Sequence, residues 1–328
     1  MCSRSASTSE APEVSTAAEA PGNRQVPGAT EAPGNRQVPG ATEAAGDPQT
    51  PEVSTAAELM ERWRRDLESW AIPDEIFAAT PESPWVLPRQ LFARRAELRL
   101  EAPSGPSFER AWEALATPGS VLDIGTGAGA ACLPLVARAT EITVVDSDAE
   151  LLSVLAASAR RLGADVRQIC GRWPDVAGEV DAADLVTCHH VLYNVPDIGP
   201  FLAELTAHAR RLVVVEITAR HPLTTLNPLW ERFHGVVRPN VPTADDMLAL
   251  LEALGLEPSF EVWSPAAERE HESFEDLVEV TRRRLCLDPG RADEVASALR
   301  EQGAEHDHLG ELRSRRLDLC TIWWSGGA

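Results

Sequence analysis

Lysine is absent from the sequence, so all thirty of its positively charged residues are arginines. This absence excludes a lysine Schiff base, a lysine general base and a Walker A phosphate loop. Aspartate and glutamate together number 51, which gives a formal net charge of -21. Such a charge repels polyphosphates, so we expect no bulk nucleic-acid binding, although a local arginine patch is compatible with it.

The chain also lacks any C-x-x-C pair, because its six cysteines are scattered at Cys2, Cys132, Cys170, Cys188, Cys286 and Cys320. Neither a zinc knuckle nor a disulfide framework is expected, which favours a reducing compartment. No apolar stretch of signal-peptide length opens the chain, and no later run approaches the roughly 18 apolar residues of a membrane span. We therefore predict a cytoplasmic protein that does not enter membranes.

Residues 1–57 consist of short copied units. EAPGNRQVPGAT begins at Glu19 and again at Glu31, and PEVSTAAE begins at Pro12 and at Pro51. Large apolar residues are nearly absent, so the segment cannot bury enough surface to offset its ordering entropy. We expect a disordered low-complexity tail, with partner docking as an alternative role.

Residues 58–118 show helical spacing. The apolar residues three or four positions apart are Leu59, Trp63, Leu67 and Trp70. Two further helices are expected over 89–99 and 108–115. Together these predict a helical cap ahead of the main domain. Its tryptophans are expected to serve packing rather than ligand contact, namely Trp63, Trp70, Trp85 and Trp112.

Residues 119–328 alternate between strand and helix patterns. Short apolar segments predict seven strands, at 120–124, 141–146, 165–170, 183–188, 211–217, 257–263 and 316–324. Amphipathic helices fill the gaps, including one from Ala149, one over 243–255 and a pair between Glu272 and Gln302. Strands of this kind pair in parallel with helices on both faces. The prediction is an α/β fold with a doubly wound, seven-stranded, mostly parallel sheet.

A proline-rich insertion follows the fifth predicted strand, at 218–242. It lies at the carboxyl edge of the sheet, where open α/β folds bind ligands. Two roles are equally compatible with its sequence. It is either a substrate lid or a structural brace anchored by Trp230 and Phe233.

A glycine-rich turn follows the first predicted strand, in the segment VLDIGTGAGA. Gly125, Gly127 and Gly129 let a ligand approach the backbone, and a helix expected over the following ACLPLVARA would offer free N–H groups. The next strand ends at Asp146, where a carboxylate can accept both hydroxyls of a ribose. The glycine count alone does not decide the cofactor class, because Gly125, Gly127 and Ala130 also satisfy the NAD fingerprint.

Asp123 separates the cofactor classes, because an acid two residues before the first glycine gives D-x-G-x-G-x-G. This pattern resembles motif I of the class I S-adenosylmethionine-dependent methyltransferases, and the resemblance covers about residues 119–217. It implies a Rossmann-like methyltransferase fold with S-adenosyl-L-methionine as cofactor. Asp123 would help hold the methionine end and Asp146 the ribose. The turn CHHVLYNVPD is also similar, since many members carry a histidine near His190.

The chain departs from the family after the third predicted strand. Where the family often has Gly-Asp-Ala, the sequence reads Gly171, Arg172, Trp173, Pro174, Asp175. Adenine would then meet Trp173 by stacking or through its backbone N–H, with Asp175 as an acceptor for the adenine amine. In all, the implied cofactor contacts are Asp123, Gly125, Thr126, Gly127, Gly129, Asp146, Ser147, Arg172, Trp173, His189 and His190.

Methyl transfer from a sulfonium requires alignment of donor and acceptor, and a general base only where the acceptor must lose a proton. The candidate catalytic residues are His190, Tyr193 and His234. Tyr193 shares a turn with His190, and His221 and His234 bracket the segment of the insertion that contains Trp230 and Phe233. His189 and His221 are further candidate bases.

The leading hypothesis is a methyltransferase that acts on an oxygen, nitrogen or carbon of a small molecule. The chain reads CHHVLYN where base-amine and glutamine-amide methyltransferases carry an N-P-P-Y-like motif, so those acceptors are disfavoured. One alternative is an NAD-dependent oxidoreductase, which leaves Asp123 unexplained, and another is a non-catalytic S-adenosylmethionine-fold protein that binds a partner through its tail. No metal is expected, because the acidic stretches at 268–276 and 304–311 show no paired ligand spacing.

Overall fold

The structure is a computed structural model that describes residues 54–85, 88–265, 273–306, 312–313 and 317–327. The described residues belong to one contact unit, Glu52–Ala328. Residues 1–53, which make up most of the tail expected to be disordered, lie outside the described residues.

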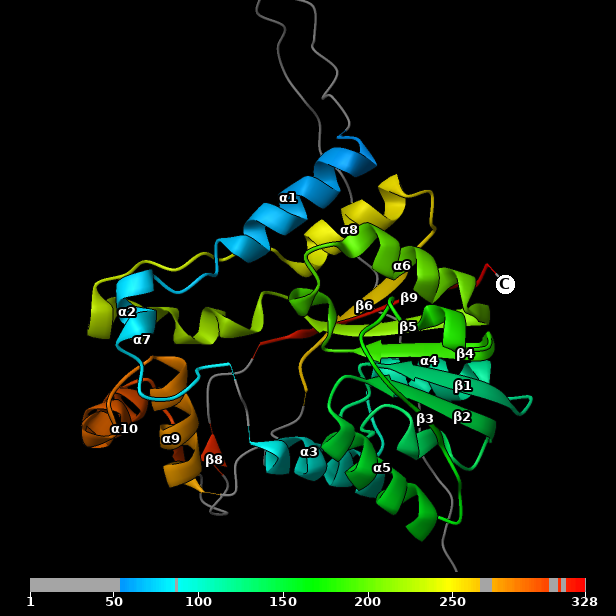
Figure 1. The fold of residues 1–328 in the computed structure, drawn as a ribbon, viewed down its shortest axis with the longest axis horizontal. Helices are drawn as coiled ribbons and strands as arrows, with labels where there is room; N and C mark the ends of the chain where they lie inside the picture. The colour runs from blue at the N-terminus through cyan, green and yellow to red at the C-terminus, as the bar shows by residue number, and fades with distance from the viewer. Residues whose placement is uncertain (1–53, 86–87, 266–272, 307–311, 314–316, 328) are drawn as a thin grey trace, which may run out of the picture. The chain divides into compact units, whose positions relative to one another are not determined.

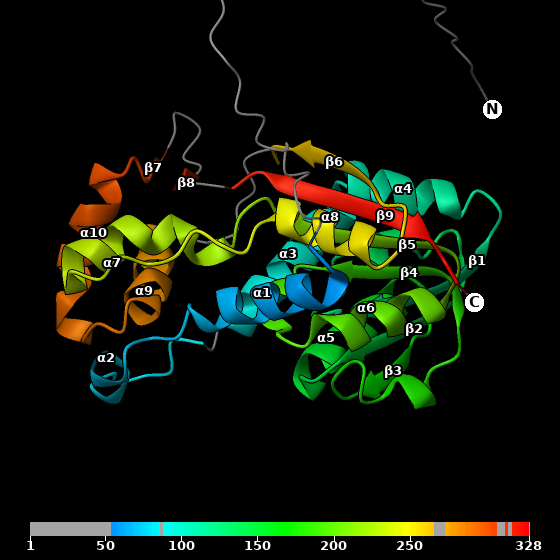
Figure 2. The same cartoon turned by 90° about the horizontal axis from the view of Figure 1, so that it is seen from above.

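A seven-stranded sheet carries the fold, with the strand order β3-β2-β1-β4-β5-β9-β6 (Figure 1, Figure 2). Its strands are β1 (Gly119–Ile124), β2 (Ala139–Asp146), β3 (Arg167–Cys170), β4 (Ala183–His189), β5 (Ala209–Thr218), β6 (Ser259–Trp263) and β9 (Leu319–Ser325). Strands β1 to β5 pair in parallel, whereas β9 runs antiparallel to both β5 and β6. The seven predicted strands and the doubly wound, mostly parallel sheet are confirmed.

Helices cover both faces of the sheet. They are α1 (Ala56–Glu68), α4 (Pro106–Ala114), α5 (Ala149–Arg161), α6 (Ile198–Ala207) and α8 (Ala244–Ala253). Val213 and Val215 of β5 face a core shared with α1, α6 and α8, whereas Val214 faces the opposite core, shared with α4 and α5. Burial on both faces explains the continuous apolar sequence of β5. The helices expected to form one cap over 58–118 are thus divided between the two faces.

Helix α1 begins at Ala56, two residues before the expected boundary, because a capping box fixes its start. Thr55 Oγ1 accepts the N–H of Glu58 at 3.3 Å, and the Glu58 carboxylate accepts the N–H of Thr55 at 2.8 Å. Reciprocal bonds of this kind satisfy N–H groups that otherwise lack partners at a helix start. The buried residues Leu59 and Trp63 then pack α1 onto the core shared with α6 and α8.

The expectation of a regular helix after the glycine loop is wrong. The chain forms only a short 3-10 turn there, η1 (Leu133–Leu135). Pro134 cannot donate a backbone hydrogen bond, and Gly129, with a φ of +94°, turns the chain just before it. Since β2 already begins at Ala139, too few residues are left for a regular helix.

A group of helices away from the sheet, which we call the helical lobe, has a core of its own (Figure 1, Figure 2). Its helices are α2 (Asp74–Ala78), α7 (Asn227–His234), α9 (Phe274–Arg284) and α10 (Ala292–Glu301). Helices α9 and α10 confirm the helical pair expected between Glu272 and Gln302. Leu229 and Trp230 are buried in this core, so part of the insertion braces the lobe.

The remaining elements are one longer helix, several 3-10 turns and a pair of two-residue strands. They are α3 (Arg89–Glu101), η2 (Ala177–Glu179), η3 (Leu192–Asn194), η4 (Pro222–Leu226), η5 (Pro289–Arg291) and the paired strands β7 (Glu305–His306) and β8 (Leu312–Arg313). Helix α3 packs against α5 and η1. The β7–β8 pair was not predicted, because two-residue strands leave no periodic signal.

Candidate active site

The glycine loop after β1 makes a turn whose shape requires glycine. Gly125 has a φ of +67°, and a Cβ at this position would lie 2.3 Å from Cγ2 of Val191. Backbone hydrogen bonds hold the turn in place, since the N–H groups of Gly125 and Thr126 donate to the carbonyl of Val145 at 2.8 and 3.2 Å. A side chain at position 125 would therefore push the loop away from the turn that follows β4.

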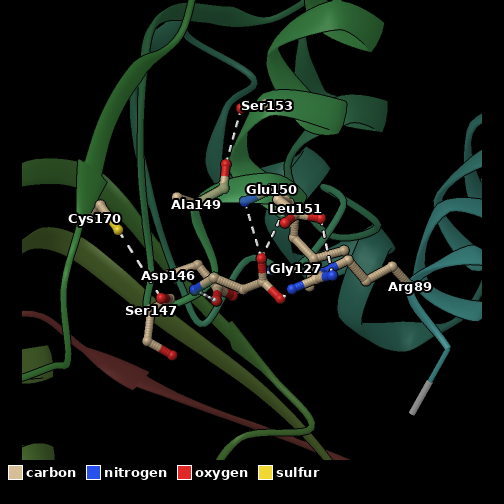
Figure 3. Close-up of polar contacts among 10 residues, drawn as sticks. Arg89, Gly127, Asp146, Ser147, Ala149, Glu150, Leu151, Ser153 and Cys170 are labelled. Carbon is tan, nitrogen blue, oxygen red and sulfur yellow. Dashed lines mark hydrogen bonds and ion pairs between the residues drawn. The ribbon is translucent and has the colours of Figure 1, made fainter. Parts of the chain in front are cut away.

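Asp146 ends β2 and holds the same loop (Figure 3). Its Oδ2 accepts the N–H of Gly127 at 2.8 Å, and its Oδ1 accepts the N–H of Asp148 at 2.9 Å. A carboxylate oxygen has two lone pairs, so each oxygen can accept one more hydrogen bond. The side chain thus fixes the loop and still offers two acceptor positions at the end of the strand.

Arg89 joins helix α3 to the start of α5 (Figure 3). Its Nε lies 2.8 Å from Oδ2 of Asp148, and its NH1 lies 2.9 Å from Oε2 of Glu150. Exposed ion pairs contribute little stability. This pair matters instead for position, because α3 carries Phe92 and Arg95 to the rim of the cavity beside the loop.

A cavity of about 470 Å³, which we call the loop cavity, lies at the carboxyl ends of β1, β2 and β4. Its volume is in the range of small-molecule sites, roughly 300–1,000 Å³. The expected cofactor contacts that line it are Asp123, Gly125, Thr126, Gly127, Asp146, Ser147, Arg172, Trp173, His189 and His190. Gly129 does not line it. A Cβ on Gly129 would meet Leu133 and Leu155 at 2.8 and 2.9 Å, so this glycine allows the loop to pack on α5.

Asp123 is almost completely buried beneath the loop, with 1% of its surface exposed. The hydroxyls of Thr126 and Thr187 donate to its two oxygens at 2.6 and 2.8 Å. Burial raises the pKa of Asp123 to about 6, although these two hydrogen bonds favour the charged form. The carboxylate is therefore a buried charge at neutral pH, and a positively charged ligand in the loop cavity would stabilise it.

Two buried ring nitrogens that belong to the lining of the loop cavity have no hydrogen-bond partner among the described residues. They are Nε1 of Trp173 and Nε2 of His189. Burial lowers the pKa of His189 to about 4, so its ring is neutral at pH 7. A buried polar group without a partner is costly, so these nitrogens mark places where a ligand would bond. Asp175, the expected acceptor for the adenine amine, is exposed and does not belong to the lining.

His190 and Glu216 form a hydrogen-bonded pair at the carboxyl ends of β4 and β5. Nε2 of His190 lies 3.1 Å from Oε1 of Glu216, and the hydroxyl of the buried Ser107 also donates to the Glu216 carboxylate. Burial alone would raise the pKa of Glu216, but the hydrogen bonds from His190 and Ser107 hold it well below its ordinary value. Glu216 is thus a carboxylate that accepts from Nε2–H, which leaves Nδ1 of His190 as the nitrogen that can take a proton.

The backbone of His190 is held in an uncommon conformation. Its φ is +59°, in the left-handed region that residues other than glycine rarely adopt. The N–H of His190 donates to the carbonyl of Glu216 at 2.7 Å, which secures this conformation. Such strain costs on the order of 1 kcal/mol and is concentrated at functional sites.

A second cavity, of about 800 Å³, adjoins the first, and we call it the outer cavity. The two cavities share Phe92, Arg95, His190 and Asn194 as lining residues. Further walls of the outer cavity include Trp70, Trp85, Arg99, Tyr193, His221 and Arg284. Trp85 is 47% exposed, which does not fit the packing role expected for it. Of the four lining residues that the two cavities share, His190 is the one with an imidazole ring.

Comparison with known proteins decides between the cofactor classes. A family model described as a methyltransferase domain matches residues 93–259, just over half of the chain. The chain belongs to this family. It is a class I S-adenosylmethionine-dependent methyltransferase. This confirms the activity and cofactor of the leading hypothesis and excludes the NAD-dependent oxidoreductase.

The individual relatives of this methyltransferase are distant. A release factor glutamine methyltransferase from Bordetella pertussis is 33% identical over 90 residues, which are 27% of this chain and 30% of that protein. The chain thus spans about a third of that relative's length. Among solved structures, the YcgJ protein from Bacillus subtilis is 18% identical with a TM-score of 0.46, and covers 68% of this chain and 98% of its own. A methyltransferase from Thiobacillus denitrificans, solved with S-adenosyl-L-homocysteine, is 17% identical with a TM-score of 0.43, at 74% and 99% coverage.

The loop cavity of the methyltransferase fits S-adenosylmethionine, the cofactor of the family. Asp146 offers two acceptor positions at the strand end, where a ribose would need them. The buried charge of Asp123 suits a cationic ligand, and the partnerless nitrogens of Trp173 and His189 suit a ligand with polar ring atoms. The chain's own groups therefore match the ribose, the cationic part and the base of this cofactor.

The geometry gives no support to a catalytic role for two of the predicted catalytic residues. His234 lies in the helical lobe, where its Nε2 is 2.7 Å from the carbonyl of Leu285 and its ring packs on Trp230. It belongs to the lining of neither cavity, so its position gives no support to a catalytic role. Tyr193 lies in the outer cavity, but its hydroxyl donates to the carbonyl of Thr218 at 2.7 Å and burial raises its pKa, so it forms a wall and does not act as a base.

Glu216 is the site residue that sequence reasoning missed. It is 3% exposed and ends the apolar run of β5, RLVVVEIT. An acidic residue near the carboxyl end of a strand that is otherwise buried was the available signal, because such charges require partners. Its partners, His190 and Ser107, come from distant segments and could not be assigned from spacing.

Metal binding, membrane insertion and disulfides can each be checked over the described residues. No group of three or more His, Cys, Asp or Glu side chains is placed there to hold a metal, although residues 268–272 and 307–311 of the acidic stretches lie outside the described ranges. Within the same ranges, no helix has the length and apolar character needed to cross a membrane. The five cysteines that the structure describes are all free.

Proposed function

We propose that this methyltransferase transfers the methyl group of S-adenosylmethionine to a small molecule held in the outer cavity, with His190 as the general base. The observation that carries the proposal is the His190–Glu216 pair at the junction of the two cavities. A base must lie within reach of both the methyl donor and the acceptor, and this imidazole belongs to the lining of both cavities.

The cofactor would be held by groups that the structure already orients. Asp146 would accept the ribose hydroxyls, and the loop around Gly125 would let the methionine part approach the backbone. Asp123 would stabilise the positive charge, and Trp173 would contact the adenine ring. S-adenosylmethionine supplies an electrophilic methyl group on a sulfonium, so the enzyme needs to supply alignment and, for a hydroxyl acceptor, a base.

The chain's residues would act on the acceptor as follows. The acceptor hydroxyl donates its proton to Nδ1 of His190 while its oxygen forms the new bond to the methyl carbon. Glu216 accepts from Nε2–H, fixes the tautomer of the ring and stabilises the imidazolium that forms. The electrons of the broken carbon–sulfur bond remain on sulfur, which becomes a neutral thioether.

A small-molecule acceptor suits the site better than a macromolecule. The outer cavity is a hollow of about 800 Å³ whose walls come from α1, α3, α9 and the insertion, rather than an extended groove. The net charge of -21 disfavours bulk nucleic-acid binding. The turn CHHVLYN after β4 lacks the N-P-P-Y-like motif of the methyltransferases that act on base amines or glutamine amides. The free cysteines are compatible with the proposed cytoplasmic location.

The direct test is turnover of a fractionated metabolite extract with methyl-labelled S-adenosylmethionine. We expect label in a compound of low molecular mass, formed by the wild type and reduced at least 100-fold by His190→Ala. His234→Gln is the matched control, because that histidine lies in the lobe, and it should retain turnover within threefold. Label that appears only in protein or nucleic acid, or equal turnover by His190→Ala, would contradict the proposal.

A further inference from the structure

Helix α9 ends in three consecutive arginines whose surroundings differ. Arg282 is buried and its guanidinium lies 2.6 Å from oxygens of both Glu82 and Glu279. Arg283 lies 3.6 Å from the same Glu82 and also donates to the carbonyl of Ser83. Arg284 is half-buried, lines the outer cavity, and makes no ion pair or hydrogen bond with any residue in the described part of the chain. Its charge is therefore directed at the cavity without a counter-ion.

Burial of Arg284 has an energetic consequence. Burial and then the neighbouring Arg283 lower the pKa of Arg284, which shows that its charge is poorly solvated. An arginine nevertheless remains protonated in proteins. A half-buried cation without a carboxylate is destabilising until an anion binds beside it, since removing one partner of a charge pair is costly.

Among the described lining residues of the outer cavity, Arg284 is the cation that lacks a counter-ion. Arg95 and Arg99 also line the cavity, but both already take part in other interactions. Glu68 is the one acidic residue among the described lining residues, and it is exposed. The place for an anion in this cavity is therefore beside Arg284.

The apolar walls of the outer cavity are flat and aromatic. Trp85 lines the outer cavity and leaves 47% of its surface exposed. Phe92 lines the junction with the loop cavity. The ring of His221 stacks on Trp70 at a centroid distance of 4.0 Å. These faces suit a planar ligand.

His221 adds a neutral donor to this wall. Its Nδ1 accepts the N–H of Leu223 at 3.3 Å, so the proton of the neutral ring is on Nε2. Burial, followed by the charges of Arg238 and Arg284, lowers the pKa of His221 to about 3. The ring therefore stays neutral above pH 4 and cannot serve as the counter-ion of Arg284.

We propose that the acceptor of this methyltransferase is a planar aromatic carboxylate, whose carboxylate pairs with Arg284 and whose hydroxyl faces His190. The inference rests on the proposed function, because that function places the reacting hydroxyl of the acceptor at His190. Arg284 belongs to the lining of the outer cavity alone, whereas His190 also borders the loop cavity. The anion and the reacting hydroxyl therefore belong at different positions on the acceptor. An outer cavity of about 800 Å³ has room for more than one ring.

The test is ligand binding to the full chain saturated with S-adenosyl-L-homocysteine. The probes are 4-hydroxycinnamate and 6-hydroxy-2-naphthoate, each compared with its neutral primary amide by calorimetric titration. We expect the acids to bind at least tenfold more tightly than the amides, and the preference to weaken with added salt. Equal binding of acid and amide, or no binding of either acid at millimolar concentration, would overturn the inference.

Variants connect the preference to one side chain. Arg284→Gln should abolish the preference for the acid, and Arg284→Lys should restore part of it. The control is Arg160→Gln, which removes one charge near the end of α5, at the opposite edge of the sheet, and should leave the preference unchanged. A preference that survives Arg284→Gln would contradict the assignment, with circular dichroism to confirm that the variant is folded.

The same assays separate this inference from the proposed function. If the acids bind through Arg284 but no methyl transfer to any small molecule is found, the proposed function fails and the anion site stands. If labelled extract yields a neutral methylated product that does not bind an anion-exchange resin, methyl transfer stands and the carboxylate acceptor is wrong.

Discussion

The loop cavity and the outer cavity are built in different ways. Most of the loop cavity comes from residues 123–201, as backbone turns at the ends of neighbouring parallel strands. The outer cavity is assembled from side chains of separate segments, within 67–71, 92–99, 190–194, 218–225 and 317–319 and at positions 85, 265 and 284. One cavity is fixed by strand ends and hydrogen bonds to the backbone, and the other by how the helical lobe packs beside the sheet.

This difference predicts how substitutions in each cavity affect the binding of cofactor and acceptor. Backbone positions such as Gly125 tolerate few substitutions, so the loop cavity should be sensitive to changes as small as one methyl group. Side-chain walls such as Arg284 and Trp85 can change without disturbing the sheet. We therefore expect changes in the loop cavity to affect cofactor binding alone, and changes in the outer cavity to affect the acceptor alone.

The largest effect on cofactor binding is expected for Gly125→Ala. The added Cβ would lie 2.3 Å from Val191, in a backbone with a φ of +67°. We expect affinity for S-adenosyl-L-homocysteine to fall at least 100-fold in calorimetric titration. Gly163→Ala is the matched control, because Gly163 also has a positive φ, +75°, but a Cβ added there would meet nothing within 4 Å. Equal losses in both variants would show that backbone strain, not the contact, is responsible.

Asp146→Ala should have the next largest effect. It removes the acceptors for the ribose hydroxyls and also the bonds to Gly127 and Asp148. Loss of a charge-assisted hydrogen bond, with hydroxyls left unpaired, should weaken binding by about 2 kcal/mol, or roughly 30-fold. Asp165→Ala, at an exposed position before β3, should bind normally. Unchanged affinity in a folded Asp146→Ala would mean that this residue only ends the strand.

Asp123→Asn should separate stability from binding. Below about pH 4 the carboxyl is protonated in both the folded and unfolded states. Between about pH 4 and 6 the folded state keeps a proton that the unfolded state releases, so stability falls as pH rises. Above pH 6 the buried carboxylate is charged, and this lowers the free energy of unfolding by about 3 kcal/mol. We expect the variant to be more stable than wild type at pH 8, by roughly 5 °C in Tm, and no more stable at pH 4.

The same variant should lose the pH dependence of cofactor binding. In the wild type, S-adenosylmethionine should bind more tightly as pH rises from 5 to 7.5, because Asp123 becomes charged near a cationic ligand. Asp123→Asn should bind about five- to tenfold more weakly at pH 7.5, with a flat profile. A lower Tm at pH 8, or an unchanged profile, would show that the buried charge has another role.

The smallest effect is expected from removal of residues 1–53. This segment lacks core-forming side chains, and no described lining residue of either cavity precedes Leu67. Keeping Thr55 preserves the capping box of α1. Affinity for S-adenosyl-L-homocysteine should stay within twofold of the full chain. A larger loss would show that the repeats contribute to the site.

The sequence predicts the loop cavity far better than the outer one, for a physical reason. Gly125, Asp123 and Asp146 lie at strand ends, and strand position can be read from apolar runs. The expected helix after the loop fails because Pro134 and the short connection to β2 override a helical pattern. Glu216 acts through partners far away in the chain, and Arg284 and Trp85 line a cavity whose walls come from separate segments. A single sequence carries no signal for such arrangements. His234 was misplaced for the same reason.

The most direct test of the account is the pH profile of methyl transfer in Glu216→Gln, with the acceptor that the labelled extract identifies. Glu216 acts through His190, so we predict that kcat at pH 7 falls about 100-fold while KM and affinity for S-adenosyl-L-homocysteine stay within threefold. The rate should recover at high pH, as the acceptor ionises without help. Glu204→Gln is the control, because Glu204 pairs with His208 at 3.3 Å and belongs to neither cavity lining. A Glu216→Gln enzyme with wild-type kcat at pH 7 would contradict the account.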